Sequence, residues 1–240
     1  MPASEPWRRV LLIGNSRWHW GESADGRCWR HRDETAAADP PLPDAWAAVG
    51  PLPPVAAGDP WRQRQLTNRQ VPLAGLPDHV GIDRALAAWG AWTRTAGPVL
   101  VADAGTALTL TLVDADGRFR GGRILAGAGL QLRALHSGTR QLPLARLRQP
   151  ITGDDPWPRD TEAALRIGVA EGLASAVTGA WVQLTGGQDA VSPWSLWLTG
   201  GDGPWLEPLL QRRGLAVRHV PGLALEALAC LAGLSPAPDP

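Results

Sequence analysis

Polar residues that could bind a phosphate or a metal stand where two predicted strands meet. After the apolar run 99–101, the chain carries Asp103, Gly105 and Thr106, and an alternating apolar and polar run extends from 108 to 113. The alternation predicts a second strand, which places these three residues at the tip between two strands. Such a tip offers backbone N–H groups to a phosphate and a carboxylate to a metal ion. The alternative is a plain hairpin with a polar turn, and this stretch alone does not decide between them.

A second turn of this type lies near the N-terminus. The run 10–13 predicts a strand and residues 17–21 predict its return strand, with a turn made of Gly14, Asn15 and Ser16 between them. Glycine lets a backbone approach phosphate oxygens closely, and a hydroxyl adds a donor. Two units of this kind, each with a helix behind it, predict a duplicated α/β architecture with a cleft between the halves.

A carboxylate stands at the start of a predicted helix over residues 82–95. The motif there is Gly81, Ile82, Asp83 and Arg84. The charge of Asp83 is favoured in the first turn by the helix dipole, so this residue is our candidate general base for a substrate hydroxyl. Arg84 is suited to holding a substrate carboxylate. The alternative is that Asp83 only caps the helix.

The remaining elements follow from hydrophobic periodicity and from glycine and proline. We expect strands at 28–30, at 55–57 within the proline-rich segment 39–60, at 195–198 and at 216–220, and helices around 130–135, 161–181, 204–211 and 223–231. Asp160 or Thr161 would cap the helix that starts there, and residues 199–201 (Thr-Gly-Gly) would form a tight turn. The expected division is an N-terminal half at 1–97, a C-terminal half at 98–234 and a tail at 235–240.

Composition narrows the function classes. The chain has 240 residues, 44% hydrophobic and 19% charged, which is typical of a globular protein. Its formal net charge is zero, so there is no electrostatic case for nucleic acid or an anionic membrane as a partner. We expect no signal peptide and no membrane helix, because no run approaches the roughly 20 apolar residues such a helix needs. The five histidines show no paired ligand spacing, so we expect no histidine metal site.

Taken in order, these motifs resemble those of the type III pantothenate kinases, members of the acetate and sugar kinase/actin-like superfamily. The resemblance spans most of the chain. It is carried by residues 11–16 (Leu-Leu-Ile-Gly-Asn-Ser), 81–84 (Gly-Ile-Asp-Arg), 103–107 (Asp-Ala-Gly-Thr-Ala), the Gly-Gly pair at 121–122 with Thr139 and Leu142-Pro143 after it, Asp160-Thr161, and 199–201 (Thr-Gly-Gly).

The resemblance implies an α/β fold of duplicated ribonuclease H-like (actin-like ATPase) domains. It also implies ATP-dependent phosphorylation of pantothenate to 4'-phosphopantothenate, the first step of coenzyme A biosynthesis, by a cytoplasmic homodimer. By the same resemblance, Asp83 accepts the proton of the pantothenate hydroxyl and Asp103 binds a monovalent cation, K⁺ or NH₄⁺. ATP and Mg²⁺ are the other cofactors that it implies. The pantothenate-binding positions are Gly81, Ile82, Arg84 and Thr161, and the ATP-binding positions are Gly14, Asn15, Ser16, Arg17 and Thr106.

One position departs from the family pattern in a way that concerns the metal. Leu12 stands where the family has an aspartate that helps to hold Mg²⁺. Either another acid serves, or Mg²⁺ is held chiefly by the ATP phosphates, or the protein turns over poorly. Two further hypotheses therefore stay open: a non-catalytic ligand-binding or accessory regulatory homologue of the same fold, and a kinase for another small hydroxy acid.

Overall fold

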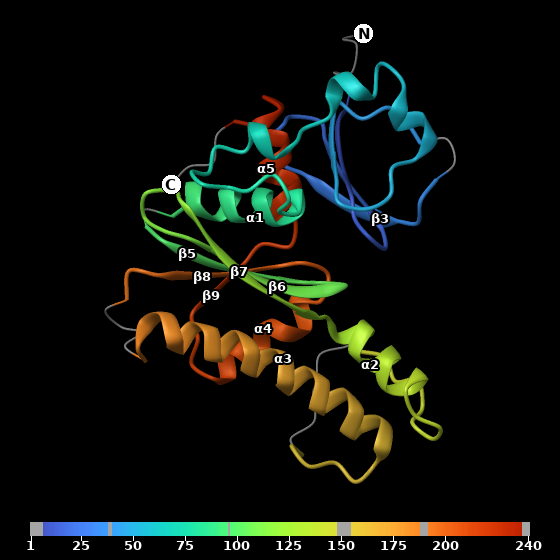
Figure 1. The fold of residues 1–240 in the computed structure, drawn as a ribbon, viewed down its shortest axis with the longest axis vertical. Helices are drawn as coiled ribbons and strands as arrows, with labels where there is room; N and C mark the ends of the chain where they lie inside the picture. The colour runs from blue at the N-terminus through green and yellow to red at the C-terminus, as the bar shows by residue number, and fades with distance from the viewer. Residues whose placement is uncertain (1–6, 38–39, 96, 148–154, 188–191, 237–240) are drawn as a thin grey trace. The chain divides into compact units, whose positions relative to one another are not determined.

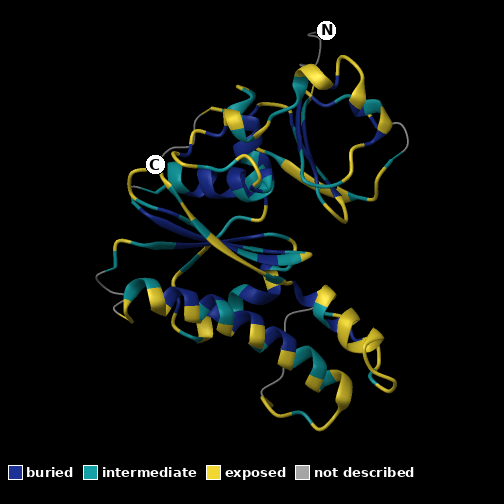
Figure 2. Cartoon of the chain, in the orientation of Figure 1, coloured by how far each residue is buried: buried dark blue, intermediate teal, exposed yellow. Residues whose placement is uncertain are grey.

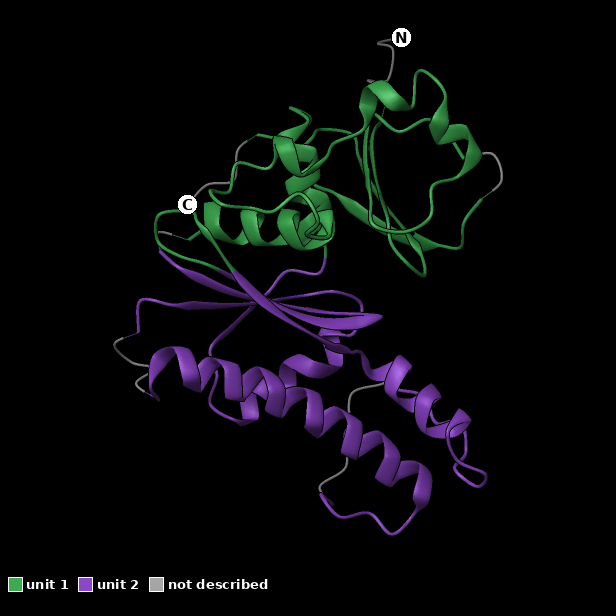
Figure 3. Cartoon of the chain, viewed as in Figure 1, with its two compact units in different colours: residues 1–96, 113–120, 222–240 green, residues 97–112, 121–221 purple. Residues whose placement is uncertain are grey.

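The computed structural model describes residues 7–37, 40–95, 97–147, 155–187 and 192–236. The chain forms two compact units, and each is discontinuous in sequence (Figure 3). Unit 1 contains residues 1–96, 113–120 and 222–240, and unit 2 contains residues 97–112 and 121–221. Compared with the division expected at residue 97, the C-terminal helix and the turn around 116 lie with unit 1. Most of the expected tail, residues 237–240, lies outside the described residues.

The sheet of unit 1, whose strands are drawn in blue in Figure 1, has the strand order β3-β2-β1-β4. Its strands are β1 (Arg8–Ile13), β2 (Trp18–Ser23), β3 (Arg30–Glu34) and β4 (Ala45–Ala48). β1 pairs antiparallel with β2 and parallel with β4, and β2 pairs antiparallel with β3. The helices α1 (Ile82–Thr93) and α5 (Leu223–Leu231) pack against each other, and both contact the sheet. The remaining helical turns of this unit are the 3-10 helices η1 (Pro54–Ala57), η2 (Arg62–Arg64) and η3 (Asn68–Gln70).

The sheet of unit 2 has the strand order β7-β6-β5-β8-β9. Its strands are β5 (Val99–Ala104), β6 (Ala107–Val113), β7 (Phe119–Ala126), β8 (Ser195–Thr199) and β9 (Val217–His219). β8 pairs parallel with β5 and with β9. The helices of this unit are α2 (Ala128–Ser137), α3 (Thr161–Thr185) and α4 (Gly203–Arg212). The two sheets share one plan, since β1 lies between β2 and parallel β4 just as β5 lies between β6 and parallel β8.

Buried residues of the strands and of the helices packed on them form a core in each unit (Figure 2). In unit 1, Trp18, Trp20 and Trp46 form a core with Leu11 and Ile13 on one face of the sheet. In unit 2, apolar residues of β5, β6 and β8 pack with α3 and α4. The strand turns described below therefore extend from buried, well-defined strands.

The proline-rich segment differs from the prediction. The run 55–57, expected as a strand, is the 3-10 helix η1, because Pro54 at its first position has the fixed φ that favours a helical turn. The strand of this region is instead β4, whose short Ala-Trp-Ala-Ala sequence carries no alternation. The predicted third strand at 28–30 is also displaced, since β3 runs from Arg30 to Glu34.

Candidate active site

The first turn, residues 14–17, joins β1 to β2 in unit 1. The backbone N–H of Gly14 donates to the carbonyl of Arg17 at 2.9 Å, which closes the turn. Asn15, Ser16 and Arg17 are exposed at its tip. Gly14 has no room for a side chain, because a Cβ there would lie 2.9 Å from the Arg17 carbonyl oxygen and 3.2 Å from Nε2 of His19. The turn is therefore a tight, glycine-based tip with its polar residues open to a ligand.

The segment after β4 packs on this turn. The N–H of Val49 donates to the carbonyl of Ile13 at 2.9 Å. A side chain on Gly50 would overlap the carbonyl oxygen of Gly14. A side chain on Gly81 would lie 3.3 Å from Cγ1 of Val49. Within unit 1, the 49–50 segment thus links the first turn to the start of α1.

Asp83 lies in the first turn of α1, where its carboxylate folds back over Gly81. Its Oδ1 accepts a hydrogen bond from the backbone N–H of Arg84 at 2.7 Å. The same oxygen would lie only 2.6 Å from a Cβ on Gly81. The residue that caps the helix is Gly81 itself, so Asp83 is not the N-cap. Gly81 and the buried Ile82 also line a pocket of about 300 Å³ in this unit.

The surroundings of Asp83 act on its pKa in both directions. Burial raises the pKa of this carboxyl group above its ordinary value. The hydrogen bond from the Arg84 N–H, the Arg84 charge and the charge of His19 each lower it, and burial outweighs them. Burial likewise lowers the pKa of the Arg84 guanidinium, which the Asp83 charge partly offsets. A mostly buried carboxylate with a raised pKa is a stronger base than an exposed one, as general base catalysis requires.

The second turn lies in unit 2 between β5 and β6. The N–H of Gly105 donates to the carbonyl of Ala107, and the N–H of Gly127 donates to the carbonyl of Thr106, both at 3.0 Å. A side chain on Gly127 would overlap the Gly105 carbonyl oxygen. The start of α2 therefore packs directly on the turn and holds it, while Thr106 remains exposed.

Asp103 lies beside the late Thr-Gly-Gly turn of the same unit. It pairs with Thr199 in the parallel register of β5 and β8. Gly200 has φ +90°, and a Cβ there would lie 2.5 Å from Oδ1 of Asp103. The N–H of Asp202 donates to the carbonyl of Ala104 at 2.8 Å. The two motifs that the sequence placed about a hundred residues apart thus meet at the ends of adjacent parallel strands.

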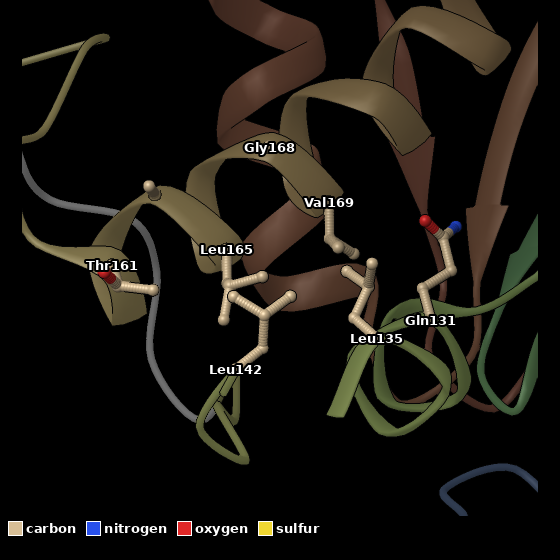
Figure 4. A pocket seen from close by; sticks show the side chains of 8 residues that line it. Gln131, Leu135, Leu142, Thr161, Leu165, Gly168 and Val169 are labelled. Atoms are coloured by element: carbon tan, nitrogen blue, oxygen red, sulfur yellow. The ribbon is translucent and has the colours of Figure 1, made fainter. Parts of the chain in front are cut away.

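Thr161 lines a pocket in unit 2, in addition to the pocket described in unit 1 (Figure 4). The helix cap is Asp160, whose Oδ1 accepts from the Ala163 N–H at 2.8 Å, so Thr161 is not needed for capping. The pocket has a volume of about 440 Å³. Leucine side chains form much of its wall, and Thr161 and Gln131 are its polar members; it is lined by Gln131, Leu135, Leu142, Thr161, Ala164, Leu165, Gly168 and Val169. It suits a ligand with an apolar body and few polar groups.

The structure therefore brings the predicted site residues together in three groups, one in unit 1 and two in unit 2. Unit 1 joins the first turn to the motif at 81–84, and unit 2 joins the second turn to residues 199–202 and separately builds the Thr161 pocket. Sequence reasoning missed His19, Asp33, Gly50 and Gly127. His19 and Asp33 lie on β2 and β3, and sequence alone could not predict the register that pairs them. The two glycines stand outside the motifs that the sequence analysis used.

The residues present do not fit a protein-held Mg²⁺ at the first turn. Leu12, which stands where an acid would be needed, is a buried hydrocarbon. Among the described residues, no group of three or more His, Cys, Asp or Glu side chains is arranged to hold a metal ion. Mg²⁺ takes oxygen ligands, usually from one or two protein carboxylates together with water and substrate phosphates. ATP phosphates are consequently the better source of its ligands.

Comparison with solved structures identifies the fold class. A Baf family transcriptional activator from Campylobacter jejuni matches with a TM-score of 0.60 at 17% identity, covering 94% of this chain and 97% of that one. A 2-dehydro-3-deoxygalactonokinase from Sinorhizobium meliloti matches with a TM-score of 0.53 at 14% identity, covering 94% of each chain. The chain has the actin-like ATPase and sugar kinase fold, as the sequence predicted.

The sequence comparisons identify the family. The model for type III pantothenate kinase matches residues 42–183, more than half of the chain. A type III pantothenate kinase of Synechococcus elongatus is 37% identical over 222 residues, which cover 85% of this chain and 87% of that protein. The chain belongs to the type III pantothenate kinase family. Within the part of the chain that the structure describes, no helix is both long and apolar enough to span a membrane.

Proposed function

We propose that the protein transfers the terminal phosphoryl group of ATP to the terminal hydroxyl of pantothenate, in the cytoplasm. The product, 4'-phosphopantothenate, is the first intermediate on the route to coenzyme A. The observation that carries this proposal is the environment of Asp83: a mostly buried carboxylate at the start of α1, linked through the 49–50 segment to the first turn. Family membership supports the choice of substrates.

The proposed chemistry needs little covalent help from the protein. Phosphoryl transfer depends mainly on alignment of the reacting oxygens and on neutralising phosphate charge. Asp83 accepts the proton of the pantothenate hydroxyl and orients it, a role typically worth about 10²–10⁴-fold in rate. Gly14, Asn15, Ser16 and Arg17 contact the ATP phosphates from the first turn, and Thr106 contacts ATP from the second.

Pantothenate combines two methyl groups, an amide, hydroxyls and a carboxylate. The leucine-lined pocket beside Thr161 suits the methyl groups, with the Thr161 hydroxyl as a hydrogen-bond partner. Gly81 and Ile82, which line the pocket of unit 1, contact pantothenate as well. Arg84 pairs with the pantothenate carboxylate.

Two cations accompany the reaction in this proposal. Mg²⁺ enters bound to ATP, because Leu12 offers it no ligand at the first turn. A monovalent cation, K⁺ or NH₄⁺, is bound at Asp103, whose carboxylate lies against Gly200 on the side where the Ala104 carbonyl oxygen also lies. Carboxylate and carbonyl oxygens are suitable ligands for such a cation.

We also propose that the protein is a homodimer. Large apolar side chains are exposed on unit 2, with Ile124 of β7 at 66% and Val182 of α3 at 48%. Arg123 of β7 hydrogen-bonds Gln183 of α3, so the two elements that carry these residues are neighbours. In a dimer these apolar side chains would be buried between the two copies of the chain. Light scattering on the purified protein should give twice the chain mass, and Ile124→Asp with Val182→Asp should give the monomer.

The experiment that tests the activity uses the intact protein with ATP, Mg²⁺ and either K⁺ or NH₄⁺. Pantothenate should be converted to a product heavier by one phosphoryl group, detected by mass spectrometry together with ADP. A panel of other small hydroxy acids should give no comparable product. A protein that binds ATP or pantothenate by calorimetry but releases no ADP under any of these cations would support the non-catalytic alternative instead.

A further inference from the structure

A row of three side chains crosses the sheet of unit 1 beside the first turn. In the register of the antiparallel strands, Leu12 of β1 lies opposite His19 of β2, and His19 lies opposite Asp33 of β3. Residues directly opposite each other in antiparallel strands project to the same face of the sheet. Leu12, His19 and Asp33 therefore form one row, with the apolar residue nearest the centre of the sheet and the acid at its edge.

This row lies on the face that α5 covers. Gly21, two residues along β2 from His19, projects to the same face, and a Cβ there would lie 3.8 Å from Cβ of Leu225 in α5. The charge of His19 also reaches Asp83 at the start of α1 and lowers the pKa of its carboxyl group.

The two ring nitrogens of His19 have different surroundings. Nδ1 lies 2.8 Å from Oδ1 of Asp33, so one side of the ring is fixed by a carboxylate. Nε2 lies on the side of the first turn, 3.2 Å from the point where Gly14 would carry a Cβ. Because Gly14 has none, the ring can approach the turn closely. The His19 side chain is 36% exposed, so a ligand at the turn can reach it.

We propose that His19 binds a phosphate oxygen of the nucleotide at the first turn, with Asp33 as its positioning residue. The inference rests on the proposed function in one respect, that residues 14–17 receive the ATP phosphates. When both ring nitrogens carry a proton, Nδ1 donates to Asp33 and Nε2–H is a charged donor, for which phosphate oxygens are acceptors. The chain has no lysine to do this, and the buried Leu12 offers a metal ion no ligand at the end of β1.

An ordinary surface ion pair would behave differently. Exposed pairs of this type contribute little to stability and would leave ligand binding unchanged. The chain offers a matched comparison in His31, which lies on β3 of the same sheet with Nε2 4.0 Å from Oε1 of Glu226. His31 has no place in the proposed site, so its substitution controls for the loss of a sheet histidine near a carboxylate.

The test is calorimetric titration of the intact protein with ATP and, separately, with adenosine, for the wild type and for His19→Ala, His19→Gln, Asp33→Asn and His31→Gln. His19→Ala should raise the Kd for ATP by about 10- to 100-fold, as expected for one charge-assisted hydrogen bond, and leave the Kd for adenosine unchanged. His19→Gln, which keeps a neutral donor, and Asp33→Asn should give smaller losses of the same selectivity. His31→Gln should bind both ligands like the wild type.

Unchanged ATP affinity in both His19 variants would overturn the proposal, as would an equal loss of ATP and adenosine binding. His19→Gln covers the case in which the alanine variant does not fold. Adenosine carries no phosphate, so comparing it with ATP isolates the contribution of the phosphates. The measurement is of binding alone and needs neither pantothenate nor turnover. A protein with the predicted ATP selectivity but no kinase activity would contradict the proposed function alone, and an active kinase indifferent to His19 would contradict this inference alone.

Discussion

Gly81→Ala is the substitution through which the placement of Asp83 can be measured most finely. A Cβ at this position would lie 2.6 Å from Oδ1 of Asp83 and 3.3 Å from Cγ1 of Val49. Ordinary van der Waals contact begins at 3.4 Å, so the carboxylate must retreat by about 0.8 Å. The backbone itself accepts alanine, since Gly81 has φ −55° and ψ 129°.

The expected consequence is a loss of rate with little loss of stability. A displacement of about 1 Å in a catalytic group can reduce the rate about 100-fold, so kcat should fall by about 10- to 100-fold. The KM for ATP should change little, because the phosphate-binding turn does not include Gly81. Replacing a helix N-cap glycine by alanine should change the free energy of unfolding by about 1 kcal/mol or less.

The assay combines steady-state kinetics with thermal unfolding of the same preparations. Gly179→Ala is the matched control, because no atom lies within 4 Å of a Cβ at that position of α3. It should leave the kinetics unchanged and stabilise the protein slightly, as alanine in a helix interior does. Wild-type kcat in Gly81→Ala, with its fold intact, would refute the placement of Asp83 as the base.

Three further predictions follow from the same geometry. Asp83→Asn should have a free energy of unfolding equal to or higher than that of the wild type at neutral pH, because burial raises the pKa of the Asp83 carboxyl group in the folded state and so makes its charged form destabilising. The wild type should gain stability relative to the variant as the pH falls through this folded-state pKa. Denaturant titrations at several pH values measure the difference. Gly200→Ala should lower the free energy of unfolding by about 1–3 kcal/mol, because φ is +90° at this position. It should also weaken the activation of the enzyme by K⁺ or NH₄⁺, because a Cβ there displaces Asp103. A cation titration of the variant that matches the wild type would contradict this. Thr161→Val should raise the KM for pantothenate about 2- to 10-fold with the KM for ATP unchanged, and equal changes in both constants would argue against the pocket assignment.

Much of this site could be predicted because its motifs combine glycine with polar residues at strand ends. The alternation from 108 to 113 and the Gly-Ile-Asp-Arg motif each depend on local sequence, and the structure has β6 and the start of α1 at those places. The parallel strand β4 could not be predicted in this way. Its four residues show no alternation, and only its pairing with β1 defines it.

Contacts between residues far apart in the chain could not be predicted from the sequence either, because they depend on strand register and tertiary packing. His19 has no ligand spacing along the chain, and its relation to Asp33 exists only through the register of β2 and β3. Gly50 stands in no motif, yet a side chain there would overlap the first turn. Asp83 could be singled out by position, whereas the burial that raises its pKa depends on tertiary packing.

The most direct measurement compares single-turnover phosphorylation of pantothenate by Asp83→Asn and by Asp116→Asn, a matched change at an exposed aspartate in the β6–β7 turn. With ATP binding preserved in both, Asp83→Asn should transfer phosphate about 10²–10⁴-fold more slowly than the wild type, and Asp116→Asn at the wild-type rate. Phosphoryl transfer by Asp83→Asn at the wild-type rate would contradict the assignment of this carboxylate as the base.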